Sequence, residues 1–171
     1  MSVVAIVQAR IGSTRLPGKV LRDLAGRSML GRVIERLRLA RRVDEVHVAT
    51  SVLAGDDAIV GECAKWNVPV HRGSEGDVLD RYYRAAHEIE GVRTVVRITS
   101  DCPLIDPGVV DRVIEALPGS DYASNVLPPR TYPRGLDTEA FTIEALDRAW
   151  SEDKDPASRE QQREVEREIA T

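Results

Sequence analysis

Short apolar runs alternate along the chain with longer segments that are apolar on one side only. The first run, Val3 to Val7, is rich in β-branched residues and has polar neighbours, which predicts a strand buried on both faces of a parallel sheet. Between 28 and 41, apolar residues recur at helical spacing with charged residues between them. We therefore expect an amphipathic helix there, with Ser28 as its cap.

The same alternation continues through most of the chain. Further strands are predicted over 46–50, 68–71, 95–99 and 121–124, further helices over 56–66, 77–89, 107–117 and 143–150, and a returning strand over 135–141. Strands and helices that alternate on this scale imply right-handed crossovers. The predicted fold class is α/β, a mainly parallel Rossmann-like sheet with helices on both faces.

Length and composition suit one compact domain. The chain has 171 residues, of which 42% are hydrophobic, so we assign residues 1–150 to a single domain. Residues 151–171 are mostly charged, with few apolar side chains, and we expect a helical, peripheral tail. The loop 125–134, which carries three prolines, is a candidate lid or dimer contact.

Charge and cysteine content exclude several classes of protein. A formal net charge of −4 gives the chain no overall attraction to nucleic acid or to an anionic membrane. The apolar opening is too short for a signal peptide or a membrane span. The two cysteines stand far apart, and His47, His71 and His87 are scattered along the sequence, so we expect no structural zinc site and a cytoplasmic location.

Ligands of open parallel sheets bind beyond the carboxyl ends of the strands, which directs attention to the loops 8–19, 50–56, 72–77 and 99–106. The first of these carries three cations, no acid, two glycines and two hydroxyls, a composition typical of a polyphosphate cradle. An exposed, solvated basic loop is the alternative interpretation. A P-loop is excluded because Ser13 and Val20 stand where that motif needs Gly and Ser or Thr, and no strand is followed by GxGxxG.

Two aspartates are candidates for a metal site. Asp101 ends the strand 95–99 at the edge that faces the basic loop, where a carboxylate can hold Mg²⁺ against phosphates. The alternative is that Asp101 caps a turn before Pro103. Asp137 is either a second metal carboxylate or an ordinary aspartate at the end of a strand. Cys102 is interpreted as a packed residue rather than a nucleophile.

These segments together resemble a known family. The stretch 9–19 resembles the N-terminal signature of the acylneuraminate and Kdo cytidylyltransferases, which make CMP-activated acidic sugars. The segments 72–81, 99–104 and 132–137 are most similar to the spore coat polysaccharide biosynthesis branch, the SpsF-like proteins. The resemblance covers residues 3 to 160, but Arg159-Glu160 is followed by Gln161 where members of the branch have His and a longer continuation.

The resemblance implies a nucleotide-diphospho-sugar transferase fold, with CTP over the first loop and Mg²⁺ as cofactor. It implies that Arg10, Lys19 and Asp101 are catalytic and that Asp101 and Asp137 bind the metal. The implied nucleotide-binding residues are Ala9, Arg10, Gly12, Ser13, Arg15, Lys19, Gly73, Ser74 and Asp77. In the segment 74–81, a helix cap is an equally valid role for Ser74 or Asp77.

The function that we expect is transfer of CMP from CTP to a small acidic acceptor, with release of pyrophosphate. Two alternatives remain open. The protein could be a nucleotide-binding or structural subunit that has lost turnover along with a shortened C-terminus. It could also be a glycosyltransferase of related fold, which the sequence disfavours because Ser100-Asp101-Cys102 supplies one aspartate and not a DxD motif.

Overall fold

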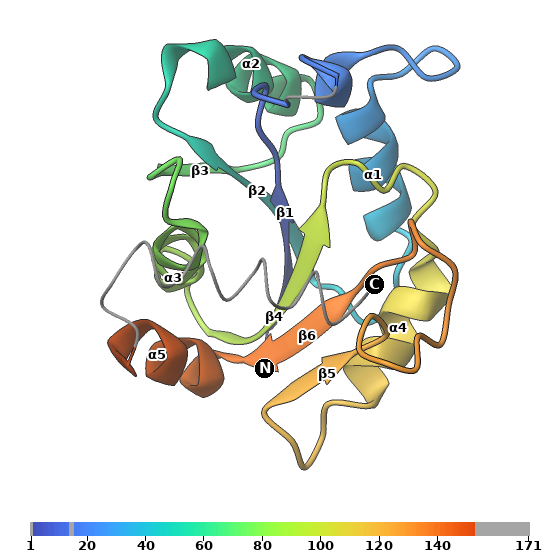
Figure 1. The fold of residues 1–171 in the computed structure, drawn as a ribbon, viewed down its shortest axis with the longest axis vertical. Helices are drawn as coiled ribbons and strands as arrows, with labels where there is room; N and C mark the ends of the chain where they lie inside the picture. Colours follow the sequence, from blue (N-terminus) through green and yellow to red (C-terminus); the bar gives the residue numbers. More distant parts are fainter. Residues whose placement is uncertain (1, 14–15, 153–171) are drawn as a thin grey trace.

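A computed structural model describes residues 2–13 and 16–152 and contains a six-stranded sheet (Figure 1). The strands lie in the order β3-β2-β1-β4-β6-β5. Their bounds are β1 Ser2–Gln8, β2 Glu45–Ser51, β3 Val70–Gly73, β4 Val92–Thr99, β5 Tyr122–Ser124 and β6 Glu139–Thr142. Strands β1 to β4 are parallel, whereas β6 is antiparallel to both β4 and β5. The predicted mainly parallel α/β fold is confirmed.

Helices follow the strands as the sequence predicts. Their bounds are α1 Met29–Leu37, α2 Asp57–Lys65, α3 Val78–His87, α4 Pro107–Glu115 and α5 Ile143–Glu152, with short 3₁₀ turns η1 Lys19–Leu21 and η2 Ala54–Asp56. The Ser28 side chain accepts a hydrogen bond from the Gly31 amide, so the expected cap of α1 is confirmed. Asp77 and Asp106 cap α3 and α4 in the same way, and Pro107 lies in the first turn of α4.

The central strand contributes to two separate hydrophobic cores. Ala5 and Val7 pack with residues of α1, α2 and α4, whereas Val4 and Ile6 pack with residues of α3 and α5. Successive side chains of a strand point to opposite faces, so a continuous apolar run is needed where both faces are covered. Figure 1 shows α3 and α5 on one side of the sheet and α1 and α4 on the other.

Two strands begin at least two residues later than the sequence predicts. The strand expected at 68–71 is at 70–73, because the Val68 amide still donates to the carbonyl of Cys63 and closes the end of α2. The strand expected at 135–141 begins at 139, because Gly135 adopts a φ of 92° and the Leu136 amide donates to Pro133 in a turn. Both differences arise from turns that hydrophobic periodicity does not detect.

His47 and His71 are far apart in the sequence but lie side by side in the fold. Parallel pairing of β2 with β3 brings His47 and His71 together, with His47 Nδ1 2.8 Å from His71 Nε2. Glu45 and Glu88 bind the outer nitrogens of the two rings. The hydrogen bonds among these four side chains link β2, β3 and the end of α3. Among the described residues, no group of three or more metal-ligating side chains could hold an ion.

Helix α5 extends to Glu152, two residues beyond its expected end. The rest of the predicted tail, 153–171, lies outside the described residues. No helix within the described ranges is long and apolar enough to cross a membrane.

Candidate nucleotide-binding site

The basic loop leaves the carboxyl end of β1 and returns on itself. The Ala9 amide donates to the Ala49 carbonyl of β2 at 3.0 Å, and the Gly18 amide donates to the Ile11 carbonyl at 3.1 Å. Gly18 has a φ of 69°, a conformation that favours glycine, and it leads directly into η1. The hydrogen bond between Gly18 and Ile11 therefore closes the loop, and Lys19 follows directly after it.

A buried carboxylate that sequence reasoning missed anchors this loop. Asp56 is 3% exposed, and its Oδ1 accepts the Ile11 amide at 2.7 Å while its Oδ2 accepts the Ser51 hydroxyl at 2.5 Å and the Ser51 amide at 3.2 Å. Burial acts to raise the pKa of Asp56, but these hydrogen bonds outweigh it and lower the pKa. Asp56 thus ties the first loop to the carboxyl end of β2.

The basic loop and the Asp101 turn meet across the carboxyl ends of β1 and β4. Lys19 Nζ lies 2.8 Å from Asp101 Oδ2, and the Ser100 amide donates to the Gln8 carbonyl at 3.0 Å. Burial acts to raise the pKa of Asp101, but hydrogen bonds from Lys19 and Thr99 lower it overall. The structure therefore places an ionised carboxylate beside a lysine of the basic loop.

The loop 72–77 adjoins the basic loop. A Cβ built on Gly12 would lie 3.8 Å from Oε1 of Glu75. The Ser74 hydroxyl accepts the Asp77 amide at 3.2 Å, and the Asp77 carboxylate accepts the Asp80 amide at 2.8 Å. The helix-cap role of this segment is therefore observed, and the nucleotide contacts of Gly73, Ser74 and Asp77 stay a prediction.

Arg81 is a second residue of this region that sequence reasoning missed. Its side chain is 3% exposed, and its Nη1 donates to the carbonyls of Ser74 and Glu75. Burial lowers the pKa of the guanidinium, and the nearby charge of Arg10 acts in the same direction. Neither Asp56 nor Arg81 could be found from periodicity, because both contact backbone groups of loops, and hydrophobic spacing does not indicate such contacts.

The remaining predicted residues of the first loop have varied surroundings. Ala9 is buried, whereas the Arg10 side chain is exposed. The Ser13 hydroxyl accepts the Leu16 amide at 3.4 Å. Arg15 lies outside the described residues.

Asp137 precedes β6, and Asp101 and Cys102 follow β4, the strand that pairs with β6. The Cys102 thiol, next in sequence to Asp101, lies 3.4 Å from the Thr99 hydroxyl. Burial raises the pKa of this thiol, in line with a packed residue rather than a nucleophile. The Asp137 carboxylate itself pairs with Arg130 at 2.5 Å.

By their donor chemistry, the carboxylates of Asp101 and Asp137 suit Mg²⁺, and their common binding of an ion stays a prediction. This hard ion takes one or two protein carboxylates and keeps water and phosphate oxygens at its other positions. Both carboxylates are accessible, and each is already paired with a cation. Among the described residues, no group of three or more metal-ligating side chains could hold an ion, so a substrate would have to supply further oxygens.

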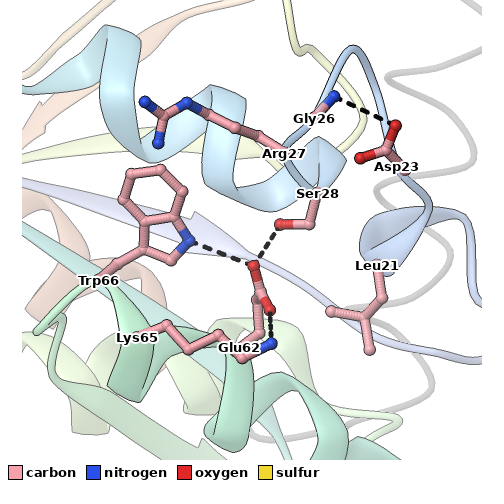
Figure 2. A pocket seen from close by; sticks show the side chains of 8 residues that line it. All are labelled: Leu21, Asp23, Gly26, Arg27, Ser28, Glu62, Lys65 and Trp66. Carbon is pink, nitrogen blue, oxygen red and sulfur yellow. Dashed lines mark hydrogen bonds and ion pairs between the residues drawn. The ribbon is translucent and has the colours of Figure 1, made fainter.

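A surface pocket lies next to η1, on the side of α1 and α2 (Figure 2). Its volume is about 480 Å³, and it is lined by Leu21, Asp23, Gly26, Arg27, Ser28, Glu62, Lys65 and Trp66. Figure 2 shows the Glu62 carboxylate between the Ser28 hydroxyl, the Lys65 ammonium and the Trp66 indole, at 2.6, 2.8 and 3.2 Å. Because these groups form hydrogen bonds with one another, we interpret the pocket as part of the contact between α1 and α2.

Comparisons with known proteins identify related sequences and folds. Residues 4–167 match the family model described as Cytidylyltransferase. The chain is 41% identical to the spore coat polysaccharide biosynthesis protein SpsF of Bacillus subtilis, over 70% of this chain and 52% of that protein. It is 37% identical to the 3-deoxy-manno-octulosonate cytidylyltransferase of Anaeromyxobacter dehalogenans, over 74% of this chain and 52% of that protein.

A solved cytidylyltransferase from Leptospira borgpetersenii superposes with a TM-score of 0.85 at 35% identity, covering 94% of this chain and 68% of that one. The chain spans between about half and two thirds of the length of the curated relatives that it matches. The family model covers nearly the whole sequence and agrees with the fold. The chain therefore belongs to the cytidylyltransferase family.

Proposed function

We propose that this protein transfers CMP from CTP to a small acidic acceptor, a sugar acid or a related compound, and releases pyrophosphate. The observation that carries the proposal is the 2.8 Å contact between Lys19 and Asp101. It joins a cationic loop suited to phosphates with a carboxylate suited to a metal, at the sheet edge where ligands of such folds bind. Membership of the family supports the choice of CTP.

The chemistry requires positioning and neutralisation of charge more than a protein nucleophile. An oxygen of the acceptor attacks the α-phosphorus of CTP, and the bond to the leaving pyrophosphate breaks. Arg10 and Lys19, with Arg15, hold that leaving group and stabilise the charge that develops on it. Gly12 and Ser13 let backbone amides approach the phosphates closely.

Asp101 and Asp137 would hold Mg²⁺ in this reaction. The ion, when bound, supplies Lewis-acid stabilisation of the phosphate oxygens. In the structure, Lys19 and Arg130 pair with the same two carboxylates. These cations keep the site electrically balanced before the substrate arrives.

Acceptor identity is inferred from the relatives. One matched relative is named for 3-deoxy-manno-octulosonate, and another for spore coat polysaccharide biosynthesis. Both names support an acidic or polysaccharide-related sugar as the acceptor. The role of the loop 125–134 as a lid or dimer contact stays a prediction.

Pyrophosphate release, measured with each of the four nucleoside triphosphates against a panel of sugar acids, tests the proposal. We expect release with CTP and Mg²⁺ and little with ATP, GTP or UTP. Arg10→Ala should weaken CTP binding or turnover without lowering the melting temperature, because it removes a charge-assisted contact of about 1.5–3 kcal/mol. Arg22→Ala removes an exposed arginine outside the loop and is the matched control.

Equal binding of all four nucleotides would refute the cytidylyltransferase assignment. Tight CTP binding without pyrophosphate release for any acceptor would instead favour a nucleotide-binding subunit without turnover.

A further inference from the structure

Two histidines and two glutamates form one continuous chain of hydrogen bonds. His47 Nδ1 lies 2.8 Å from His71 Nε2, while the centroids of the two rings are 5.1 Å apart and their planes differ by 19°. Because the centroids are much farther apart than the two nitrogens, the rings meet edge to edge. The outer nitrogens bind carboxylates, His47 Nε2 to Glu45 at 3.0 Å and His71 Nδ1 to Glu88 at 2.5 Å. All four ring nitrogens therefore have a partner.

These partners determine how many protons the two rings carry. An ionised carboxylate only accepts hydrogen bonds, so each outer nitrogen must carry a hydrogen. A hydrogen bond between the two inner nitrogens needs a hydrogen on one of them and a lone pair on the other. The two rings then hold three N–H groups, whereas two neutral imidazoles hold two. All the hydrogen bonds are therefore made only when the histidine pair carries one positive charge.

The surroundings of the histidine pair favour this single charge. The side chains of His47 and His71 are 7% and 11% exposed, and a buried charge is costly unless it is paired and hydrogen-bonded. Here a carboxylate lies at each end of the pair. Other ionisable side chains on or next to β2, β3 and α3 bind partners outside this chain of hydrogen bonds, namely Asp44, Arg72, Tyr82, Arg84 and His87. Glu45 and Glu88 are therefore the groups that balance the shared proton.

The histidine pair lies where the sheet has least support from neighbouring strands. β3 is an edge strand that pairs only with β2, over four residues (Figure 1). α3 begins four residues after β3 ends and packs against it. The bond between His47 and His71 links β2 to β3, and Glu88 continues the link to the C-terminal end of α3. One chain of side chains therefore adds to the backbone pairing of this edge.

We propose that His47 and His71 form a pH-dependent structural link, in which one shared proton holds β3 and the end of α3 to β2. A second proton puts N–H groups on both inner nitrogens, so the inner bond breaks and two like charges face each other. Loss of the shared proton leaves two facing lone pairs, unless an outer nitrogen gives up its hydrogen and its carboxylate contact. The link is therefore complete only at intermediate pH, and the two histidines titrate as a pair.

Denaturant unfolding of wild type and His71→Gln between about pH 5 and 8 tests the link. At the acid end, unfolded chains bind two protons and the folded pair one, so the stabilisation by the pair rises with pH. At the alkaline end, the folded pair keeps a proton that unfolded chains have lost, so the stabilisation falls. Glutamine keeps a hydrogen-bonding group at this position but does not titrate. We expect the ratio of the unfolding constants of His71→Gln and wild type to pass through a maximum, roughly tenfold above its value at either end, as for one charge-assisted hydrogen bond.

His87→Gln is the control, because His87 also lies in α3 but is 40% exposed and pairs with Asp147. Its ratio to wild type should show no maximum. A ratio for His71→Gln that changes in one direction only, or an equal maximum for His87→Gln, would overturn the proposal.

NMR of the wild-type protein tests the shared proton even if His71→Gln does not fold. The chemical shifts of the ring nitrogens report which of them carry hydrogen. At the pH of greatest stabilisation, we expect hydrogen on both outer nitrogens and one hydrogen shared between His47 Nδ1 and His71 Nε2. A direct passage from two neutral rings to two charged rings, without this intermediate state, would overturn the proposal. Neither experiment depends on the proposed transfer of CMP.

Discussion

Replacing Asp56 with Asn should separate the anchoring of the first loop from its charge. Asp56 accepts three hydrogen bonds in the folded protein, from the Ile11 amide and from the amide and hydroxyl of Ser51. Asparagine has nearly the same shape, but one acceptor oxygen becomes an NH₂ donor. The Ser51 hydroxyl can turn to accept from that NH₂, whereas an amide of Ile11 or Ser51 cannot.

The expected loss follows from this count. Hydrogen bonds to a charged group contribute about 1.5–3 kcal/mol each, and a buried donor left without an acceptor costs about 1–3 kcal/mol. Because the contacts share one carboxylate, they do not add. We therefore expect Asp56→Asn to lower the free energy of unfolding by about 2–3 kcal/mol. Release of the Ile11 amide should also weaken CTP binding, since it loosens the loop that carries Arg10.

Denaturant unfolding as a function of pH is the assay. The folded-state pKa of Asp56 is lowered, so its stabilisation is complete above the ordinary aspartate pKa of about 4 and is lost as the pH falls through the lowered value. The difference between wild type and Asp56→Asn should be constant from about pH 7 to 5 and should narrow below about pH 4. Asp57→Asn is the control, because Asp57 is adjacent but exposed, with an ion pair to Arg72. Equal stability of the two variants would refute the anchoring role.

Three further predictions follow from particular contacts. Lys19→Ala should weaken CTP binding roughly tenfold and raise the pKa of the Asp101 carboxyl, which NMR titration measures. Asp101→Asn should spare much of the nucleotide binding but remove its dependence on Mg²⁺; a metal titration equal to wild type would make Asp101 a turn residue only. Gly31→Ala should lower the melting temperature, because its Cβ would lie 2.5 Å from the Trp66 ring. Gly61→Ala, which adds a Cβ in open space on α2, should raise the melting temperature. Equal shifts for the two variants would contradict this packing argument.

The strands and helices could be predicted because they depend on the local pattern of hydrophobic residues. The edge of the sheet at which the loops meet follows from the order of those elements. A β-branched run such as Val3 to Val7 has few alternatives to a strand covered on both faces. Once β1 and β4 are parallel neighbours, their carboxyl ends coincide, and the loops that follow must lie together. The contact of Lys19 with Asp101 is a consequence of that topology and not of either residue alone.

The anchors of the loops could not be predicted because each acts through hydrogen bonds to loop backbone, which the hydrophobic pattern does not indicate. Asp56 stands between an exposed turn and a helix, where an aspartate is common for reasons of capping alone. His47 and His71 come together only through the register of β2 and β3. Side-chain to backbone contacts of this kind have no period and no fixed spacing.

The two buried anchors have opposite charges and act on the two loops in complementary ways. Asp56 accepts a backbone amide of the first loop, and Arg81 donates to backbone carbonyls of the second. A buried charge that hydrogen-bonds to the backbone of a loop from the core side satisfies those backbone groups. They then need no hydrogen-bond partner in a neighbouring loop. The loops can then present their outer polar groups to a ligand without collapsing onto each other. An enzyme that neutralises charge mainly by position needs such rigidity in its empty site, because groups that must be reoriented during the reaction stabilise it less. The buried charges beneath the loops are therefore as much a part of the proposed site as the exposed Arg10 and the half-buried Lys19.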